Sequence, residues 1–235
     1  MSAPLPAPVT PRVTSIDEAI TRMEIIDAGL PATDGLACFN RMYLEVTREV
    51  RERLKAGFFA DPAFMTRLDV VFANLYFQAA DVAARPGAVP LAWRPLIEQR
   101  EQPGIEPIQF ALAGMNTHIN HDLPIAVVQT CAELGTAPAD GTHRADYQKV
   151  DRLLDAIEQS VRQSFESAAE RAADRHLAAV ANLIACWTIN SARDLAWTNS
   201  LLLWQVRDDQ AGYELLGDSL AVSAELAGRL LLVAV

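Results

Sequence analysis

Hydrophobic residues recur along most of the chain at the three- and four-residue spacing of amphipathic helices, and the strict alternation of a half-buried strand is nearly absent. Ser15 is a predicted N-cap that opens the first helix, and Asp34 opens a second helix that ends at Gly57. Asp61 followed by Pro62 is a strong start signal for a third helix. The pattern predicts an all-α, single-domain bundle of roughly seven to nine helices.

Three of the predicted helices carry apolar residues on most of their faces, and such helices lie in the middle of a bundle. They span Asp61–Ala84, Pro107–Asp122 and Leu177–Val206. Each contains a polar interruption, and burying an unpaired amide or hydroxyl costs on the order of 2–7 kcal/mol. We therefore expect the interruptions to meet in one buried polar site, built from side chains on neighbouring helices.

The N-terminus reads "MSAPLPAPVTPRV" and has neither the basic start nor the apolar core of a signal peptide. Its prolines predict a disordered arm over residues 1–14, because proline favours stiff, extended backbone and does not continue a helix. A single all-helical domain is expected over residues 15–235, since no change of composition in that range indicates a domain boundary.

Composition and charge serve mainly to exclude functions. The formal net charge of −10 argues against nucleic acid or an anionic membrane surface as a partner. Cys38, Cys131 and Cys186 are widely spaced, which favours free thiols in a reducing compartment such as the cytoplasm. There is no phosphate-binding loop or dinucleotide fingerprint, so no nucleotide cofactor is expected and the predicted ligand is a small molecule.

The densest group of polar residues is the segment "GMNTHINHDLP", which lies between two apolar stretches. On a helix, His118 and Asp122 are one turn apart on one face. Asn116 and Asn120 form a second pair on nearly the opposite face, and they are the candidate residues for binding a ligand or cofactor. The segment thus offers two polar faces to two different neighbours.

Glycine and proline add backbone features to the same segment. Gly114 lies one turn before His118 and permits close approach by a ligand or another part of the chain. Pro124 predicts either a kink or a new helix capped by Asp122. His121 either joins the polar pair or turns outward.

An imidazole and a carboxylate at this spacing can bind one divalent metal ion, or can act as a base with its orienting partner. Under the first hypothesis His118, Asp122 and a carboxylate such as Asp69 or Asp194 bind one zinc, iron or manganese ion in a metal-dependent hydrolase. Arg193 and Asp194 are the only charges in the third apolar helix, and both are candidate catalytic residues. Two further histidines, His143 and His176, are predicted at the surface, unless His143 folds over the site as a third ligand.

Three other hypotheses remain open. In the first of them, a metal-free His–Asp site catalyses an isomerisation, elimination or cyclisation. In the second, the protein is structural and its polar core only fixes the fold. A binding protein holds a small ligand in an apolar pocket, and the predicted lining of that pocket includes Phe72, Tyr76, Trp187 and Trp197.

The segments "FALAGMNTHINHDLPIAVV", "RLDVVFANLYF" and "RDLAW" together resemble a bacterial and fungal family of unknown function. The resemblance covers the chain from about Ile16 onward and implies no established activity. The family's signature is N-x-H-I-N-x-D-L, in which His121 occupies an unspecified position. The matching residues are Asn116, His118, Ile119, Asn120, Asp122 and Leu123.

A second similarity is to helical, zinc-dependent phospholipases C, and it rests on His118 and Asp122 alone. Those enzymes bind metal through an H-x-x-x-D helix, so the similarity implies a metal site. The chain contains 4 histidines, too few for the three-metal centre of that group. The similarity is therefore an analogy between two residues and not evidence of common function.

Overall fold

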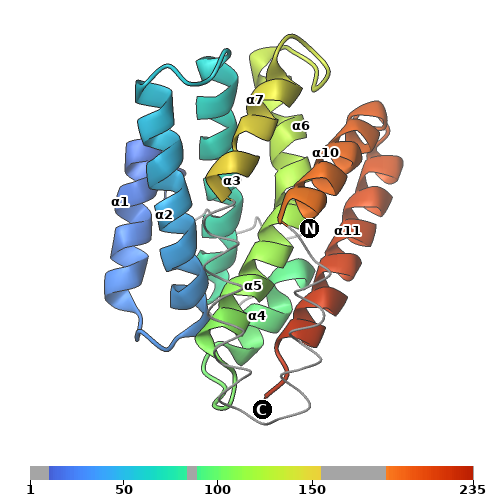
Figure 1. Cartoon of the computed structure of the whole chain (residues 1–235). Coiled ribbons are helices and arrows are strands. Elements are labelled where there is room, and N and C mark those ends of the chain that lie inside the picture. Colours follow the sequence, from blue (N-terminus) through green and yellow to red (C-terminus); the bar gives the residue numbers. More distant parts are fainter. Residues whose placement is uncertain (1–10, 84–88, 155–188, 235) are drawn as a thin grey trace.

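The computed structural model describes residues 11–83, 89–154 and 189–234, and within these ranges it consists of helices joined by loops, without a strand (Figure 1). The all-α, single-domain prediction is confirmed. Residues 177–188 of the third predicted apolar helix lie outside the described ranges. The described elements are α1 (Ile16–Gly29), α2 (Gly35–Lys55), α3 (Pro62–Ala83), η1 (Leu91–Trp93), α4 (Arg94–Gln99), α5 (Pro107–Thr117), η2 (His118–Asp122), α6 (Leu123–Leu134), α7 (His143–Lys149), α10 (Ile189–Gln205) and α11 (Gln210–Leu231).

The helix boundaries follow from local capping chemistry. Ser15, Asp34 and Asp61 each accept a hydrogen bond from a backbone N–H of the following turn, at 3.2, 2.8 and 2.9 Å. Caps of this kind stabilise a helix by about 1 kcal/mol each. Gly57 and Gly135 follow the ends of α2 and α6 with φ of 69° and 68°, a left-handed conformation that favours glycine. The starts predicted at Ser15, Asp34 and Asp61 and the stop predicted at Gly57 are confirmed.

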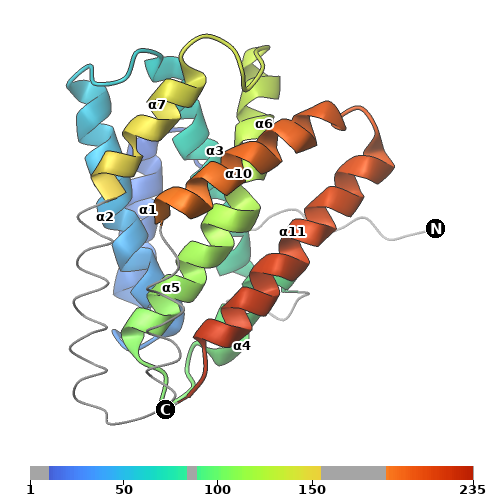
Figure 2. The same cartoon turned by 45° about the vertical axis from the view of Figure 1, so that its right-hand side comes forward.

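The central feature of the bundle is a continuous rod formed by α5, η2 and α6 (Figure 1). On one side α2 packs against α5 and α3 against α6, while α1 packs on α2. On the other side α11 crosses α5 and α10 crosses α6 (Figure 2). The motif segment therefore lies between the two sides. No helix in the described part of the chain is long and apolar enough to cross a membrane.

Pro124 disturbs the helix, but not by starting a new helix capped by the Asp122 side chain. Instead, His118–Asp122 form a π turn, in which the Leu123 N–H donates to the carbonyl of His118. In an α-helix the proline ring would collide with the carbonyl four residues earlier, and a wider turn avoids that collision. The helix does not restart, and the Asp122 side chain makes no capping hydrogen bond. Such π turns frequently occur at functional sites.

Gly114 permits a close approach as predicted, but the approaching group is the aromatic side chain of Phe39. A Cβ atom at position 114 would lie 2.4 Å from Phe39 Cγ, and the Phe39 ring is fully buried. We expect Gly114→Ala to lower the free energy of unfolding by about 2 kcal/mol, measured by urea titration, because overpacking displaces buried rings. Gly217→Ala is the matched control, since its Cβ would meet nothing within 4 Å. Equal stability of both variants would contradict the tight packing.

The predicted arm lies mostly outside the described ranges, which begin at residue 11. Its last part is held against α3 by the Asn74 side chain. Asn74 Oδ1 accepts the Val13 N–H at 3.0 Å, and Asn74 Nδ2 donates to the Val13 carbonyl at 2.9 Å. The Val13 side chain is buried in the main core. The chain is thus already anchored just before Ser15 opens α1.

Candidate functional site

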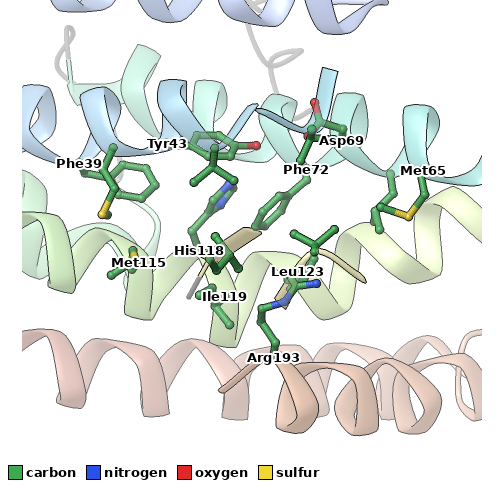
Figure 3. A pocket seen from close by; sticks show the side chains of 16 residues that line it. Phe39, Tyr43, Met65, Asp69, Phe72, Met115, His118, Ile119, Leu123 and Arg193 are labelled. Carbon is green, nitrogen blue, oxygen red and sulfur yellow. The ribbon is translucent and has the colours of Figure 1, made fainter. Parts of the chain in front are cut away.

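A cavity of about 80 Å³ lies between α2, α3, the π turn and α10 (Figure 3). This volume is roughly six times the minimum that one water molecule needs, so the cavity has room for a small molecule. Most of its wall is apolar and includes Phe39, Phe72, Met65, Met115 and Leu123. Its polar lining groups among the described residues are few, namely the side chains of Tyr43, Asp69, His118 and Arg193.

His118 lies at the centre of this wall with its side chain 3% exposed. Its ring stacks on Phe72, with centroids 3.5 Å apart and planes 4° from parallel, and meets the Tyr43 ring edge-on at 4.6 Å. Nδ1 lies 2.8 Å from Asp122 Oδ2, whereas Nε2 has no hydrogen-bond partner among the described residues. Because a carboxylate only accepts, the proton belongs on Nδ1 and leaves a free lone pair on Nε2.

Asp122 is a buried carboxylate that accepts three hydrogen bonds. Oδ2 accepts from His118 Nδ1 and from Trp93 Nε1 at 3.0 Å, and Oδ1 accepts from His121 Nδ1 at 2.7 Å. Burial raises the pKa of Asp122, but the hydrogen bonds from both histidines outweigh burial and hold the pKa below its usual range. Asp122 is therefore ionised at neutral pH and fixes the orientation of the His118 ring.

Burial has the larger effect on His118. It lowers the pKa of the imidazole below its ordinary value, although the hydrogen bond to Asp122 acts in the opposite direction. His118 is consequently neutral at pH 7. A neutral imidazole with a free Nε2 and an orienting carboxylate on Nδ1 is the arrangement of a general base.

Asp69 and Tyr43 place two more unpartnered polar atoms at the same cavity. Neither Asp69 Oδ2 nor the Tyr43 hydroxyl has a hydrogen-bond partner among the residues that the structure describes. Burial raises the pKa of Asp69 to about 7, and it is the only cause of that shift. Burial, and then the charge of Asp69, raise the pKa of Tyr43 well above its usual value. Buried polar atoms are normally paired, so their convergence on one cavity calls for an explanation.

Arg193 lines the cavity, but its guanidinium is largely engaged elsewhere. Nε donates to Asp151 Oδ1 at 2.5 Å and Nη2 donates to the Tyr147 carbonyl at 2.8 Å. The guanidinium carbon also lies 4.1 Å from the centroid of the Tyr147 ring. Arg193 thus holds α10 against α7. Asp194 does not reach the cavity, because adjacent helical residues point about 100° apart; its side chain is 57% exposed and pairs with Arg144.

Asn116 and Asn120 are not brought to the cavity either. Asn116 Nδ2 donates to the Ala224 carbonyl of α11 at 2.9 Å, and Asn120 Nδ2 donates to Asn116 Oδ1 at 3.0 Å. The predicted second polar face exists, and the neighbour it meets is helix α11. These bonds attach the central rod to α11, so no ligand contact is assigned to the two asparagines.

We expect Asn116→Ala to lower the free energy of unfolding by about 1–2 kcal/mol, because it leaves the Ala224 carbonyl and the Asn120 amide without their partner. Ligand binding in the cavity should not change, because Asn116 lies on the opposite face of the rod. Thermal unfolding with and without ligand measures both quantities. A variant that loses ligand affinity at unchanged stability would return Asn116 to the candidate binding residues.

His143 is buried, so the prediction of a surface residue is wrong. Its ring stacks on Phe64 at 3.9 Å, Nδ1 lies 3.0 Å from the Ala137 carbonyl, and Nε2 lies 3.3 Å from Asp61 Oδ2. The reason is that α7 packs on the start of α3, which the spacing of residues in the loop does not reveal. His143 does not line the cavity around His118. His176 lies outside the described ranges.

Two residues at the site were missed from the sequence, and the membership of a third was left undecided. Tyr43 and Trp93 were not singled out, and the role of His121 was left open. Among the aromatic residues predicted to line an apolar pocket, Phe72 lines the cavity. Tyr76 instead donates its hydroxyl to Asn40, and Trp197 packs on Tyr147; Trp187 is not among the described residues.

The expected metal ligands are not arranged as a chelate. Three N–H donors occupy the Asp122 oxygens on the Nδ1 side of His118, so the two residues do not present two ligands to one ion. Within the described ranges, no group of three or more His, Cys, Asp or Glu side chains is placed to hold a metal ion. His118 and Asp69 both line the cavity, with His118 Nε2 and Asp69 Oδ2 unpartnered among the described residues, and the His118–Asp122 geometry fits a base with its orienting partner.

The fold and the site define a class of protein, an all-α bundle with a buried His–Asp pair beside an apolar cavity. The model of the Family of unknown function (DUF5995) matches residues 16–234, and the chain belongs to this family. Searches of curated proteins and of solved structures each found no match. The membership therefore brings no established activity.

Proposed function

We propose that this protein is an enzyme that applies acid–base catalysis, without a metal ion, to a small and largely apolar molecule in the cavity. His118 Nε2 is the general base and Asp122 is its positioning residue. The Tyr43 hydroxyl donates a hydrogen bond to the substrate atom that gains negative charge. The observation that supports the proposal is the free Nε2 of a buried, oriented histidine in the wall of an apolar cavity.

The reaction step follows from the protonation states. His118 is neutral, so Nε2 takes a proton from a carbon atom of the substrate, and the electron pair of the broken C–H bond moves onto the neighbouring group. The imidazolium that forms lies 2.8 Å from the ionised Asp122, which stabilises it. Nε2 then returns the proton to another atom in an isomerisation, or to a leaving group in an elimination. General-base catalysis of this kind contributes about 10²–10⁴-fold in rate.

Deuterium exchange tests this function without a known substrate. We expect the protein in D₂O to catalyse deuterium incorporation into at least one member of a panel of small carbonyl compounds and aminoketones, detected by mass spectrometry. His118→Gln should lower the exchange rate by about 10²-fold or more, because the base is removed. His143→Gln is the matched control, since it removes a buried histidine outside the cavity.

Two results would overturn the proposal. One is an exchange rate that is equal in wild type and His118→Gln. The other is stoichiometric zinc, iron or manganese in the purified wild-type protein that is absent from His118→Gln, measured by elemental analysis. The second result would instead support the metal-dependent hydrolase predicted from the sequence.

A binding protein without catalysis is the second candidate, and the apolar wall of the cavity favours it. Recovery of a tightly bound ligand, unchanged and without exchanged protons, would support this candidate. For either function we propose a cytoplasmic location. The observation behind it is that Cys38 and Cys131 are free, buried thiols, as a reducing compartment allows.

A further inference from the structure

The charge balance of the cavity is informative about its occupant. Asp69 lies on α3 with its side chain in the cavity wall, and Oδ2 is buried without a partner among the described residues. The residue is 9% exposed. An ionised carboxylate in such a place costs several kcal/mol unless a cation or several hydrogen bonds compensate it.

Three cations that line the cavity or adjoin its lining residues in sequence are already paired. Arg193, which also lines the cavity, donates to Asp151. Arg67, two residues before Asp69, pairs with Glu133 on the outside of the bundle. Lys149, next to the lining residue Val150, pairs with Asp146. Within the described ranges the cavity thus carries one acidic side chain in excess, and a cationic group on the ligand would compensate its charge.

The surroundings distinguish between kinds of cation. A hydrated metal ion needs several oxygen or nitrogen ligands, and among the described lining residues the strong ligand types without a partner are Asp69 Oδ2 and His118 Nε2. An organic ammonium needs one counter-ion and benefits from aromatic rings nearby. Tyr43 and Phe72 supply such rings beside Asp69, and the methionine and aliphatic wall accommodates an apolar body (Figure 3).

We propose that the cavity takes a small molecule with an apolar body and one protonated amine, and that the ammonium group pairs with Asp69. The cavity volume fits on the order of six non-hydrogen atoms. This inference rests on the proposed function, because it takes the cavity as the substrate site and assigns the charge class of that substrate. His118 then faces the apolar body, where the reacting carbon lies.

Three compounds with one ring test the charge class, namely cyclopentylamine, cyclopentanol and cyclopentanecarboxylate. Calorimetry is done at pH 8 in phosphate, because Tris is itself an amine. We expect the amine to bind wild type at least 10-fold more tightly than the alcohol, and the carboxylate not to bind. In Asp69→Asn the advantage of the amine over the alcohol should fall at least 10-fold. Asp194→Asn, which removes an exposed carboxylate, should leave it unchanged.

The amine inference is overturned if the amine and the alcohol bind wild type equally, if Asp69→Asn keeps the preference, or if none of the three compounds binds. His118→Gln separates this inference from the proposed function. Amine binding that depends on Asp69, without any exchange that depends on His118, supports the charge class and contradicts the catalytic role. His118-dependent exchange of neutral compounds, without a preference for amines, supports the catalytic role and contradicts the charge class.

Discussion

Replacing Asp122 by alanine is expected to lower the free energy of unfolding at pH 7 by about 3–5 kcal/mol, measured by urea titration. The variant removes the acceptor of three N–H groups, the buried ones of Trp93 and His118 and the partly buried one of His121. Each donor left unsatisfied costs about 1–3 kcal/mol, and no other acceptor among the described residues is bonded to them. Asp194→Ala, which removes an exposed carboxylate, should change stability by less than about 0.5 kcal/mol.

The contribution of Asp122 should depend on pH. Its pKa in the folded protein is lower than in the unfolded chain, so its stabilisation is fully present above the unfolded value of about 4 and is lost as pH falls through the folded value. The difference between wild type and Asp122→Ala should therefore shrink in acid. A loss below about 1 kcal/mol at pH 7 would show that the three donors find other partners.

Asp122→Asn keeps the shape of the side chain but replaces one acceptor oxygen with an N–H donor. The amide cannot accept from all three donors, so His118 is no longer held with its proton on Nδ1. Nitrogen NMR shifts of the imidazole report this change of tautomer directly. We expect the deuterium exchange to fall even where the variant remains folded, because an Nε2 that carries the proton is not a base.

Features encoded by neighbouring residues could be predicted from the sequence. The caps at Asp34 and Asp61 and the stop at Gly57 depend on side-chain and backbone chemistry within one helical turn, and all three are confirmed. The His118–Asp122 hydrogen bond follows in the same way from a spacing of four residues. The π turn was not predicted, because the sequence only shows that Pro124 disturbs an α-helix and not which backbone geometry relieves the disturbance.

The partners of His118 and Asp122 across helices could not be predicted. Tyr43 and Phe39 are four residues apart on an apolar face, which is also the pattern of ordinary core residues. Trp93 Nε1 needs a partner when it is buried, but several buried acceptors were available in the sequence. The spatial neighbours that decide between these possibilities come from the packing of α2 and η1 against the central rod.

Helical periodicity could have predicted which of Arg193 and Asp194 is buried. Arg193 is in phase with Ile189, Ala196 and Trp197, all of which are buried in α10. Asp194 is one step further round the helix and therefore faces solvent. Helical phase thus separates two adjacent charges that a count of polar residues treats as equal.

Replacing Asp69 by asparagine is expected to raise the free energy of unfolding at pH 8 by about 3 kcal/mol, although it alters a buried residue. Burial raises the pKa of Asp69 from its ordinary value of 3.8 to about 7. Below pH 3.8 both states are protonated and burial has no ionic cost. Between 3.8 and 7 the unfolded chain ionises first, so the folded state loses stability as pH rises, by up to about 4 kcal/mol. Asparagine avoids this loss but leaves a buried amide, which costs about 1 kcal/mol.

Thermal unfolding in phosphate from pH 4 to 8, without any amine present, measures the effect of Asp69→Asn. A gain of about 3 kcal/mol corresponds to a rise in Tm of roughly 6–12 °C for a chain of this size. The gain should be smallest at pH 4 and grow up to pH 8, whereas Asp194→Asn should show no such trend. Addition of cyclopentylamine should stabilise wild type and reduce the difference, because the ammonium compensates the buried charge. If Asp69→Asn is less stable than wild type at pH 8, then Asp69 has a partner in the folded protein, and the cavity does not need a cation from its ligand.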